Sequence, residues 1–262
     1  MVRGLSARVE VGVAQAQGLS PSMEDAHRII PDMGGKRGAL FAAVFDGHGR
    51  AEASQIAARE VPELFQRALK GGFSVEEAFH SAYIEVDRSI KGVTSSGTTA
   101  SSIYLERDRI HYAHVGDSRI VLASGSEALA LTRDHKATDP EEKAQLQARG
   151  GRFWGNYVVL PTGMGLAMSR ALGDRDFEGL ISRTPDVGSH ILTARDRLII
   201  IGCDGLWDVL TNQDAASIAG SEADAQSAAD ALVRAALAAG SSDNVTAILL
   251  FFRKAQRSGA AP

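Results

Sequence analysis

The chain has 262 residues, of which 44% are hydrophobic and 23% are charged, so its composition is that of a folded globular protein rather than a disordered one. It carries 28 lysines and arginines against 32 aspartates and glutamates, a net charge of −4, which argues against a general nucleic-acid binder. The single cysteine excludes an intramolecular disulfide and a cysteine-rich zinc site, and it fits a reducing, cytoplasmic environment. No apolar run approaches the roughly 20 residues of a membrane helix, and no basic tract favours a membrane surface.

The first third of the chain is predicted to contain two strands and two helices. Apolar and polar side chains alternate over residues 8–17, and residues 40–45 are a short apolar run before a glycine turn, so both ranges predict strands. Apolar side chains have helical spacing over residues 50–69. A second helix should follow Ser74, because Ser74 and Glu77 have the spacing of a capping box. Its inward-facing side chains are predicted to be Ala78, Phe79, Ala82, Tyr83 and Val86.

The rest of the chain is predicted to contain more strands than helices. An antiparallel meander is predicted over residues 102–105, 110–115, 119–123 and 128–131. Helices are predicted over residues 140–149 and 222–239. Strands are predicted over residues 198–203 and 244–252. Strands in meanders and helices in pairs favour α+β layers, such as a two-sheet sandwich with helices outside. The small, polar tail after residue 253 is expected to be frayed.

Acidic residues stand at turns, most of them where a predicted strand begins or ends. Asp46, Asp117 and Asp204 follow predicted strands beside a glycine, Asp243 precedes the closing strand, and Glu24 and Asp25 follow a Ser-Pro-Ser turn. A carboxylate at a strand end lies at the rim of a sheet, and a neighbouring glycine lets a ligand approach the backbone closely. Each of these acids alone is more simply a turn residue, but several in one chain favour convergence. Converging carboxylates need compensating cations, and oxygen ligands favour Mg²⁺ or Mn²⁺.

Three other hydrolytic chemistries lack their sequence signatures. The chain has no phosphate-binding loop of the form Gly-x-x-x-x-Gly-Lys-Ser/Thr and no Gly-x-Ser-x-Gly nucleophile elbow. A cysteine-based phosphatase has an arginine six residues after its nucleophile, whereas Val209 stands at that position after Cys203. Cys203 ends an apolar run, so we interpret it as a small buried core residue.

Eight short motifs occur in an order that resembles the metal-dependent protein Ser/Thr phosphatases of type 2C. They span nearly the whole chain and are MEDAH (23–27), VFDGHG (44–49), SGTTA (96–100), VGDSR (115–119), DHK (134–136), MSRALGD (168–174), CDGLWD (203–208) and GSSDNVT (240–246). The resemblance implies a four-layer α-β-β-α sandwich of two antiparallel sheets flanked by helix pairs. It also implies that residues 1–262 are one catalytic domain, with a variable flap near residues 150–165.

The resemblance implies two divalent cations, Mg²⁺ or Mn²⁺, in the core site. Asp46 would bridge them, and Gly47 would bind one through its carbonyl oxygen. Asp204 and Asp243 would complete the first metal site. Two such cations about 3.5–4 Å apart can share a water and lower its pKa, so the bridging hydroxide attacks phosphorus without a nucleophilic side chain.

The resemblance also implies roles for residues around the core site. Glu24 and Asp25 would hold waters of the second metal. Asp117, with Asp204 and Asp208, would supply a third, weaker metal site. His48 would be the general acid that protonates the leaving serine or threonine oxygen. Without the resemblance, His48 is more simply a turn histidine bonded to the backbone.

The sequence departs from the family pattern at the phosphate-binding arginine. The family has an arginine three residues before the methionine of MEDAH, and Ser20 stands there in this chain. A guanidinium binds two phosphate oxygens at once, which a serine hydroxyl cannot do, so activity should be weaker or the substrate choice altered. The residues that could replace this charge are Arg28, Lys36 and Arg50.

Two further arginines and three flap aromatics each have both a structural and a functional interpretation. Arg119 and Arg170 resemble phosphate binders, but we expect each to pair with a buried carboxylate. The flap aromatics either contact substrates or regulators, or pack the flap onto the body. These aromatics are Phe153, Trp154 and Tyr157.

The favoured function is hydrolysis of phosphoserine and phosphothreonine in proteins. The expected partners are phosphorylated proteins, with no nucleic acid and no membrane, and the chain is expected to be a monomer. The alternative from a different class is a catalytically weak or inactive relative that binds phosphoproteins or a signalling partner, which Ser20 motivates. A third option is a metal phosphatase for small phosphoesters.

Overall fold

Two five-stranded antiparallel sheets lie face to face in the computed structural model, which describes residues 8–253. In spatial order, the strands of the first sheet are β1 (Arg8–Ala16), β16 (Val245–Arg253), β15 (Asp196–Gly202), β8 (Arg119–Ser124) and β9 (Glu127–Ala130). The strands of the second are β14 (Asp186–Ile191), β7 (Arg109–Val115), β6 (Ala100–Glu106), β3 (Leu40–Phe45) and β2 (Ala26–Pro31). The tail after residue 253, expected to be frayed, lies outside the described residues.

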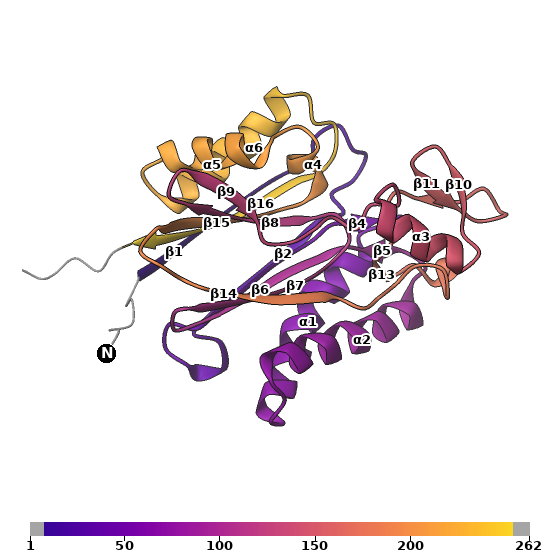
Figure 1. Cartoon of the computed structure of the whole chain (residues 1–262), viewed down its shortest axis with the longest axis horizontal. Helices are drawn as coiled ribbons and strands as arrows, with labels where there is room; N and C mark the ends of the chain where they lie inside the picture. The colour runs from indigo at the N-terminus through magenta and orange to yellow at the C-terminus, as the bar shows by residue number, and fades with distance from the viewer. Residues whose placement is uncertain (1–7, 254–262) are drawn as a thin grey trace, which may run out of the picture.

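Helices cover the outer face of each sheet. Figure 1 shows α1 (Glu52–Lys70) and α2 (Val75–Val93) together below the second sheet, and α5 (Asn212–Ser221) and α6 (Ala225–Ala238) above the first. The short helix α4 (Asp204–Trp207) follows β15 on the same side as α5 and α6. The expected four-layer α-β-β-α sandwich is therefore confirmed.

Strand β3 shows why the central strands are continuously apolar. Its residues alternate between two cores: Leu40, Ala42 and Val44 pack between the sheets, whereas Phe41, Ala43 and Phe45 pack against the helices. Every residue of β3 is buried, because the strand has another layer on each face. The same alternation in β15 places Ile199 and Ile201 in the core between the sheets.

Helix α2 begins as the capping pattern predicts. The Ser74 side chain accepts a hydrogen bond from the Glu77 N–H, and the Glu77 carboxylate accepts one from the Ser74 N–H. Its predicted inward-facing side chains are all buried: Ala78, Phe79, Ala82, Tyr83 and Val86.

The predicted single meander is wrong in one respect. Strands β6 and β7 pair in the second sheet, whereas β8 and β9 pair in the first. The chain crosses between the sheets after Val115, where Gly116 has a φ of 94° that favours glycine. Local alternation of side chains predicts a strand but not the sheet that receives it, so the crossing was not visible in the sequence.

Other elements were missed or shifted. The sequence did not predict β2, β14, α4 or α5, nor the strands of two or three residues that lie between residues 47 and 173, because their apolar patterns are short or broken. The helix predicted over residues 222–239 begins later, at Ala225, because the Asp224 side chain accepts a hydrogen bond from the Ser227 N–H and caps it.

The flap region forms a separate small layer beside the sandwich. It consists of α3 (Pro140–Ala148) and three short strands, β10 (Arg152–Trp154), β11 (Tyr157–Val159) and β12 (Gly165–Leu166), at the right of Figure 1. Phe153 packs on the small flap core, whereas Trp154 is 79% exposed and Tyr157 is 50% exposed. The two readings of the flap aromatics therefore divide by residue: Phe153 packs, and the other two face outward.

Candidate metal centre

The predicted carboxylates converge where strands of both sheets begin or end. Asp46 directly follows β3 and Asp25 directly precedes β2, and Ala26 is paired with Phe45 across these strands. Asp204 begins α4 just after β15. Asp117 lies in the crossing from β7 to β8.

Asp25 and Asp46 lie at the centre of this group. Oxygen atoms of both carboxyls and the Cys203 sulfur all lie within 4.8 Å of one another. One oxygen of Asp25 accepts a hydrogen bond of 2.5 Å from the Thr246 hydroxyl, whereas its Oδ1 is buried without a partner. Asp117 Oδ1 is likewise buried without a partner. Unpartnered carboxylate oxygens buried together are the donor set that a divalent cation takes, so the residues present fit such an ion.

Burial and neighbouring acids raise the pKa values of four of these carboxyls. Burial raises the pKa of Asp46 well above its ordinary value, and the negative charges of Asp204, Asp25 and Asp117 raise it further. Burial and neighbouring acids also raise the pKa of Asp25 to about 6 and that of Asp117 to about 7. The pKa of Asp204 is raised for the same two reasons. Cations at this cluster would offset the mutual repulsion of these carboxylates.

Cys203 is not a nucleophile in this arrangement. It is fully buried, its thiol donates to the Asn244 carbonyl at 3.3 Å, and its sulfur accepts from the Thr246 N–H at 3.1 Å. Burial and the charges of Asp25 and Asp46 raise the pKa of its thiol well above the ordinary value. The predicted core role of Cys203 is confirmed.

Asn244, to which the sequence reading gave no role, anchors the loop that carries Glu24. Its Oδ1 accepts from the Glu24 N–H at 2.6 Å, and its amide nitrogen donates to the carbonyls of Gln17 and Ser22, each at 2.9 Å. Asn244 thereby joins the loop before β2 to the start of β16. The only sequence signal was its place beside Asp243 in GSSDNVT.

Glycine is required at two places where these segments touch. A Cβ at Gly47 would lie 2.4 Å from the Glu24 carbonyl oxygen, and a Cβ at Gly205 would lie 2.0 Å from the Asn244 carbonyl oxygen. Any larger side chain would push the acidic loops apart. Because these two glycines have no Cβ, the backbone after Asp46 can contact that of Glu24, and the backbone after Asp204 can contact that of Asn244.

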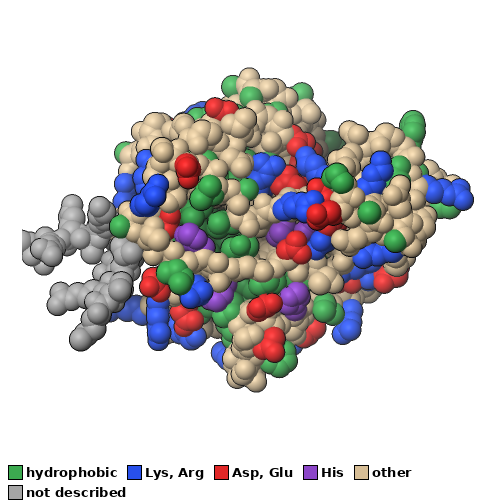
Figure 2. Space-filling model, viewed as in Figure 1, with side chains coloured by type: hydrophobic (Ala, Val, Ile, Leu, Met, Phe, Trp, Pro, Cys, Tyr) green, Lys and Arg blue, Asp and Glu red, His purple; other side chains and the backbone are tan. Residues whose placement is uncertain are grey.

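The remaining predicted acids lie toward the surface. Asp243 and Asp208 are exposed, and Asp208 forms an ion pair with Lys136 at 2.8 Å. The charge of Lys136 also lowers the pKa values of Asp117 and Asp204, against the larger raising effect of burial. Figure 2 shows acidic and basic side chains gathered between the places of α4 and α3 in Figure 1.

His48 is partly buried beside this cluster and contacts Asp174. It lies in the short strand β4 (Gly47–His48), and its Nε2 is 2.8 and 2.9 Å from the two oxygens of Asp174. Burial alone would lower the pKa of His48, but the hydrogen bond and charge of Asp174 outweigh it, so the pKa is raised. Asp174 ends the motif MSRALGD, and nothing in the sequence predicted its contact with His48.

The loop of Ser20 brings no guanidinium of its own. The Ser20 carbonyl accepts from the Gln17 side chain at 2.8 Å, and the preceding Leu19 is 85% exposed. Lys36, one of the suggested replacements, pairs with Glu106 at 2.8 Å. Lys36 precedes β3 and Asp46 follows it, so the six residues of the strand, about 20 Å, separate them. Lys36 therefore does not replace the missing arginine.

Arg119 and Arg170 pair with carboxylates, as expected for structural residues. Arg119 donates to both oxygens of Asp134, at 2.8 and 2.6 Å, and its guanidinium lies over the Trp207 ring. Arg170 donates to Glu142, which is 6% exposed, and to Asp186. Both structural interpretations are confirmed.

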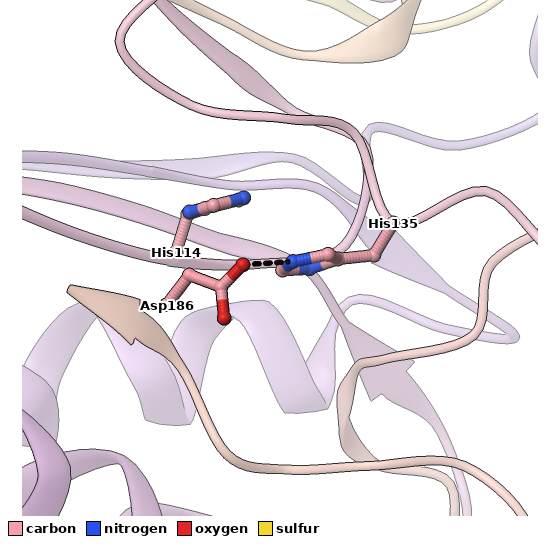
Figure 3. A group of neighbouring side chains, drawn as sticks. All are labelled: His114, His135 and Asp186. Atoms are coloured by element: carbon pink, nitrogen blue, oxygen red, sulfur yellow. Dashed lines mark hydrogen bonds and ion pairs between the residues drawn. The ribbon is translucent and has the colours of Figure 1, made fainter. Parts of the chain in front are cut away.

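Figure 3 shows a second group of possible ligands, His114, His135 and Asp186. The two histidine rings stack with centroids 4.3 Å apart and an angle of 10° between their planes. His135 Nε2 contacts Asp186 at 3.0 Å, and its Nδ1 accepts from the Gly116 N–H at 3.2 Å. A ring lone pair lies in the ring plane, so two stacked rings do not direct theirs at one ion. This geometry suits a packed hydrogen-bonded cluster rather than a metal site.

No helix within residues 8–253 is long and apolar enough to cross a membrane.

Comparison with known proteins assigns the family. The family model described as protein phosphatase 2C matches residues 9–245. Among curated proteins, the chain is 32% identical to protein phosphatase 2C homolog 1 of Saccharomyces cerevisiae, covering 92% of each chain. It is 28% identical to protein phosphatase 1B of Rattus norvegicus, covering 94% of this chain and 71% of that one.

Solved structures agree with this assignment. The serine-threonine phosphatase 2C from Toxoplasma gondii has the same fold, with a TM-score of 0.85 over 96% of each chain at 24% identity. A sex-determining protein of C. elegans matches with a TM-score of 0.80 and 27% identity, over 94% of this chain and 65% of that one. With the family model matching most of its length, the chain belongs to the protein phosphatase 2C family of protein serine/threonine phosphatases.

Proposed function

We propose that this chain removes phosphate from phosphoserine and phosphothreonine in proteins, using Mg²⁺ or Mn²⁺ held by the converging carboxylates. The observation that carries the proposal is the cluster of Asp25, Asp46 and Asp117: one oxygen of Asp25 and one of Asp117 are buried without a partner, and the pKa values of all three carboxyls are raised. Such a cluster is destabilising unless cations compensate it. Its place in a chain of this family supports the assignment to phosphate ester hydrolysis.

The proposed metal ligands are those that the family resemblance implies. Asp46 lies at the centre of the cluster and would contact two ions, with Asp204 and Asp243 completing one site. Glu24 and Asp25 would hold the waters of the second ion, and Asp117 and Asp208 would contribute to a third. The Gly47 carbonyl would be a further oxygen ligand. When bound, these cations would supply a water of lowered pKa and orient the phosphate oxygens for in-line attack.

His48 would supply the proton that the leaving group needs. A serine or threonine alkoxide is a poor leaving group, so a proton must reach its oxygen as the P–O bond breaks. His48 lies two residues after Asp46, at the edge of the acidic cluster. No nucleophilic side chain is required by this arrangement.

The direct test is phosphate release from a phosphothreonine peptide with and without Mn²⁺. We expect Mn²⁺-dependent turnover that Asp46→Asn abolishes. The thermal transition of both proteins, measured by circular dichroism, is the folding control. A folded wild-type protein that binds Mn²⁺ but releases no phosphate contradicts the proposal.

The alternative function is a binding module for phosphoproteins, favoured by Ser20. Ser20→Arg restores the cation that the family places there, and Ser20→Gln is a matched control with a long uncharged side chain. If the chain is an active enzyme that lacks only this contact, Ser20→Arg should raise kcat/KM by roughly 10-fold, or about 1.4 kcal/mol. A wild-type protein that binds phosphopeptide without turnover, and that gains turnover only as Ser20→Arg, identifies the binding module.

A further inference from the structure

His48 and Asp174 are brought together by a small sheet apart from the two large ones. The strands β4, β5 (Gly97–Thr98) and β13 (Leu172–Gly173) form a three-stranded sheet with β5 in the centre. Gly97 of β5 pairs with His48 on one side and with Gly173 on the other. Asp174 directly follows Gly173. Segments that are 126 residues apart in the chain thereby meet across Gly97.

Gly97 leaves the space in which the two side chains meet. A Cβ at Gly97 would lie 2.3 Å from His48 Nε2 and 2.1 Å from Asp174 Oδ2. No other residue type fits there without separating the pair. The contact between His48 and Asp174 therefore depends on the pairing of the three strands and on the glycine at position 97.

The backbone around Asp174 is held in an uncommon conformation. Asp174 has a φ of 48°, in the left-handed region that L side chains rarely adopt, and Gly173 before it has a φ of 84°. The Gly173 N–H donates to the buried carboxylate of Asp87 at 2.9 Å. Asp87 in turn pairs with Lys91 at 2.7 Å and Arg183 at 3.4 Å. This network holds the turn, which directs the Asp174 side chain at His48.

The contact leaves one ring nitrogen of His48 for chemistry. Both oxygens of Asp174 face Nε2, and since a carboxylate only accepts hydrogen bonds, Nε2 carries a proton. Nδ1 points away from Asp174 and is buried without a partner. In the Ser-His-Asp arrangement of hydrolases, a carboxylate likewise holds one ring nitrogen so that the other faces the reacting atoms.

We propose that Asp174 is the positioning residue of His48: it fixes the ring and its Nε2–H, so that Nδ1 is the atom that hands a proton to the leaving oxygen. As the P–O bond breaks, the Nδ1 proton passes to the serine or threonine oxygen. The ring is left neutral, with its Nε2–H still donated to Asp174, and Nδ1 regains a proton from water that enters the site as the product leaves. This inference rests on the proposed function, in which His48 is the proton donor.

The test is a double-mutant cycle with Asp174→Ala, His48→Gln and the double variant. Two substrates are used: a phosphothreonine peptide and p-nitrophenyl phosphate, whose leaving group is a stable anion that needs little help from a proton donor. We expect Asp174→Ala to lower kcat on the peptide about 100-fold, and to lower it at least 10-fold less on p-nitrophenyl phosphate. In the His48→Gln background, the same change should cost less than 3-fold. Equal losses in both backgrounds, or on both substrates, overturn the proposal.

A spectroscopic measurement tests the role of Asp174 without requiring an active enzyme. Nitrogen-15 NMR of the metal-free protein above neutral pH reports which nitrogen of His48 carries the proton. We expect the Nε2–H form in the wild type and loss of that fixed form in Asp174→Ala. An unchanged tautomer overturns the proposal even if the protein is inactive. A fixed tautomer in a protein without turnover supports the Asp174 contact while removing the proposed function.

Two controls separate positioning from folding. Asp196 contacts Nε2 of His190 at 3.0 Å, so Asp196→Asn is a matched change in a second Asp–His pair outside the proposed site. It should leave the ratio of the two substrates unchanged. Asp174→Asn keeps the size of the side chain and enters the same cycle in case Asp174→Ala does not fold. A loss that disappears in the His48→Gln background supports the proposal, and an equal loss in both contradicts it.

Discussion

At the residue scale, individual side chains do more than their motifs indicate. Asn244 uses its oxygen and its amide nitrogen to bind three backbone groups of the loop over residues 17–24. The Thr246 hydroxyl occupies one oxygen of Asp25 and leaves the other buried without a partner. These contacts fix where the acidic side chains lie, although neither residue is itself acidic. The proposed metal centre therefore depends on neighbours that the carboxylate pattern does not identify.

Arg119 is predicted to stabilise the fold. Arg119→Ala should lower the free energy of unfolding by about 2–3 kcal/mol, because it leaves the largely buried Asp134 carboxylate without its partner. Arg59→Ala is the control, since Arg59 pairs on the surface with Glu60 and should change stability by less than about 0.5 kcal/mol. Urea unfolding monitored by tryptophan fluorescence measures both. Equal effects would contradict the structural role of Arg119.

At the scale of elements, local signals describe helix ends well and sheet membership poorly. The capping box at Ser74 predicts where α2 begins, because the hydrogen bonds involved lie within four consecutive residues. The assignment of β8 and β9 to the first sheet depends on contacts with β15, far along the chain. Element type is thus a local property here, and sheet assignment is a long-range one.

Ser74 also provides a prediction at this scale. Ser74→Ala should lower the free energy of unfolding by about 1 kcal/mol, because it removes the acceptor of the Glu77 N–H at the first turn of α2. Ser81→Ala is the matched control on the same helix, where Ser81 donates to Glu85 on the exposed side and alanine is a better helix former. Chemical denaturation of both variants should give opposite or clearly unequal changes. A Ser81→Ala loss as large as that of Ser74→Ala would refute the capping role.

At the scale of the whole molecule, the acidic cluster links folding to metal binding. Asp46→Asn should raise the stability of the metal-free protein at neutral pH by about 1 kcal/mol, because it removes one charge from a cluster in which burial and mutual repulsion raise the carboxyl pKa values. The same change should remove the stabilisation that Mn²⁺ gives the wild type, about 2.7 kcal/mol at 100 times the Kd.

Calorimetric unfolding with Mn²⁺ and with a chelator measures both effects of this substitution. Asp176→Asn, a change at an exposed acid, should alter neither. A metal-free Asp46→Asn protein that is less stable than the wild type would contradict the predicted repulsion, and one that Mn²⁺ still stabilises fully would show that Asp46 does not hold the metal.

The buried histidine pair predicts a loss of stability in acid. Burial, and then the neighbouring His135, lower the pKa of His114 to about 4 from its ordinary 6.5. Between these values the unfolded chain takes up a proton at His114 that the folded chain does not, so stability falls as pH drops from about 6.5 to about 4. This proton uptake lowers the free energy of unfolding by about 2–3 kcal/mol.

Comparison with His114→Asn isolates this contribution from those of other titrating groups. The stability advantage of the wild type over the variant should shrink by about 2–3 kcal/mol between pH 7.5 and pH 4, as measured by urea unfolding at each pH. Parallel stability curves for the two proteins would show that His114 does not titrate with a lowered pKa.

The sequence by itself predicted layers of sheets and helices, the helices α1, α2, α3 and α6, every strand of the two large sheets except β2 and β14, and the acidic residues of the proposed metal centre. These properties depend on local periodicity, on caps and on the order of short motifs, all of which are written in consecutive residues. Only the tertiary structure decided which sheet receives each strand, that Asn244 anchors the Glu24 loop, that Lys136 pairs with Asp208, and that Asp174 meets His48 across Gly97. Each of these joins segments far apart in the chain, and a contact of that kind exists only after the layers have packed.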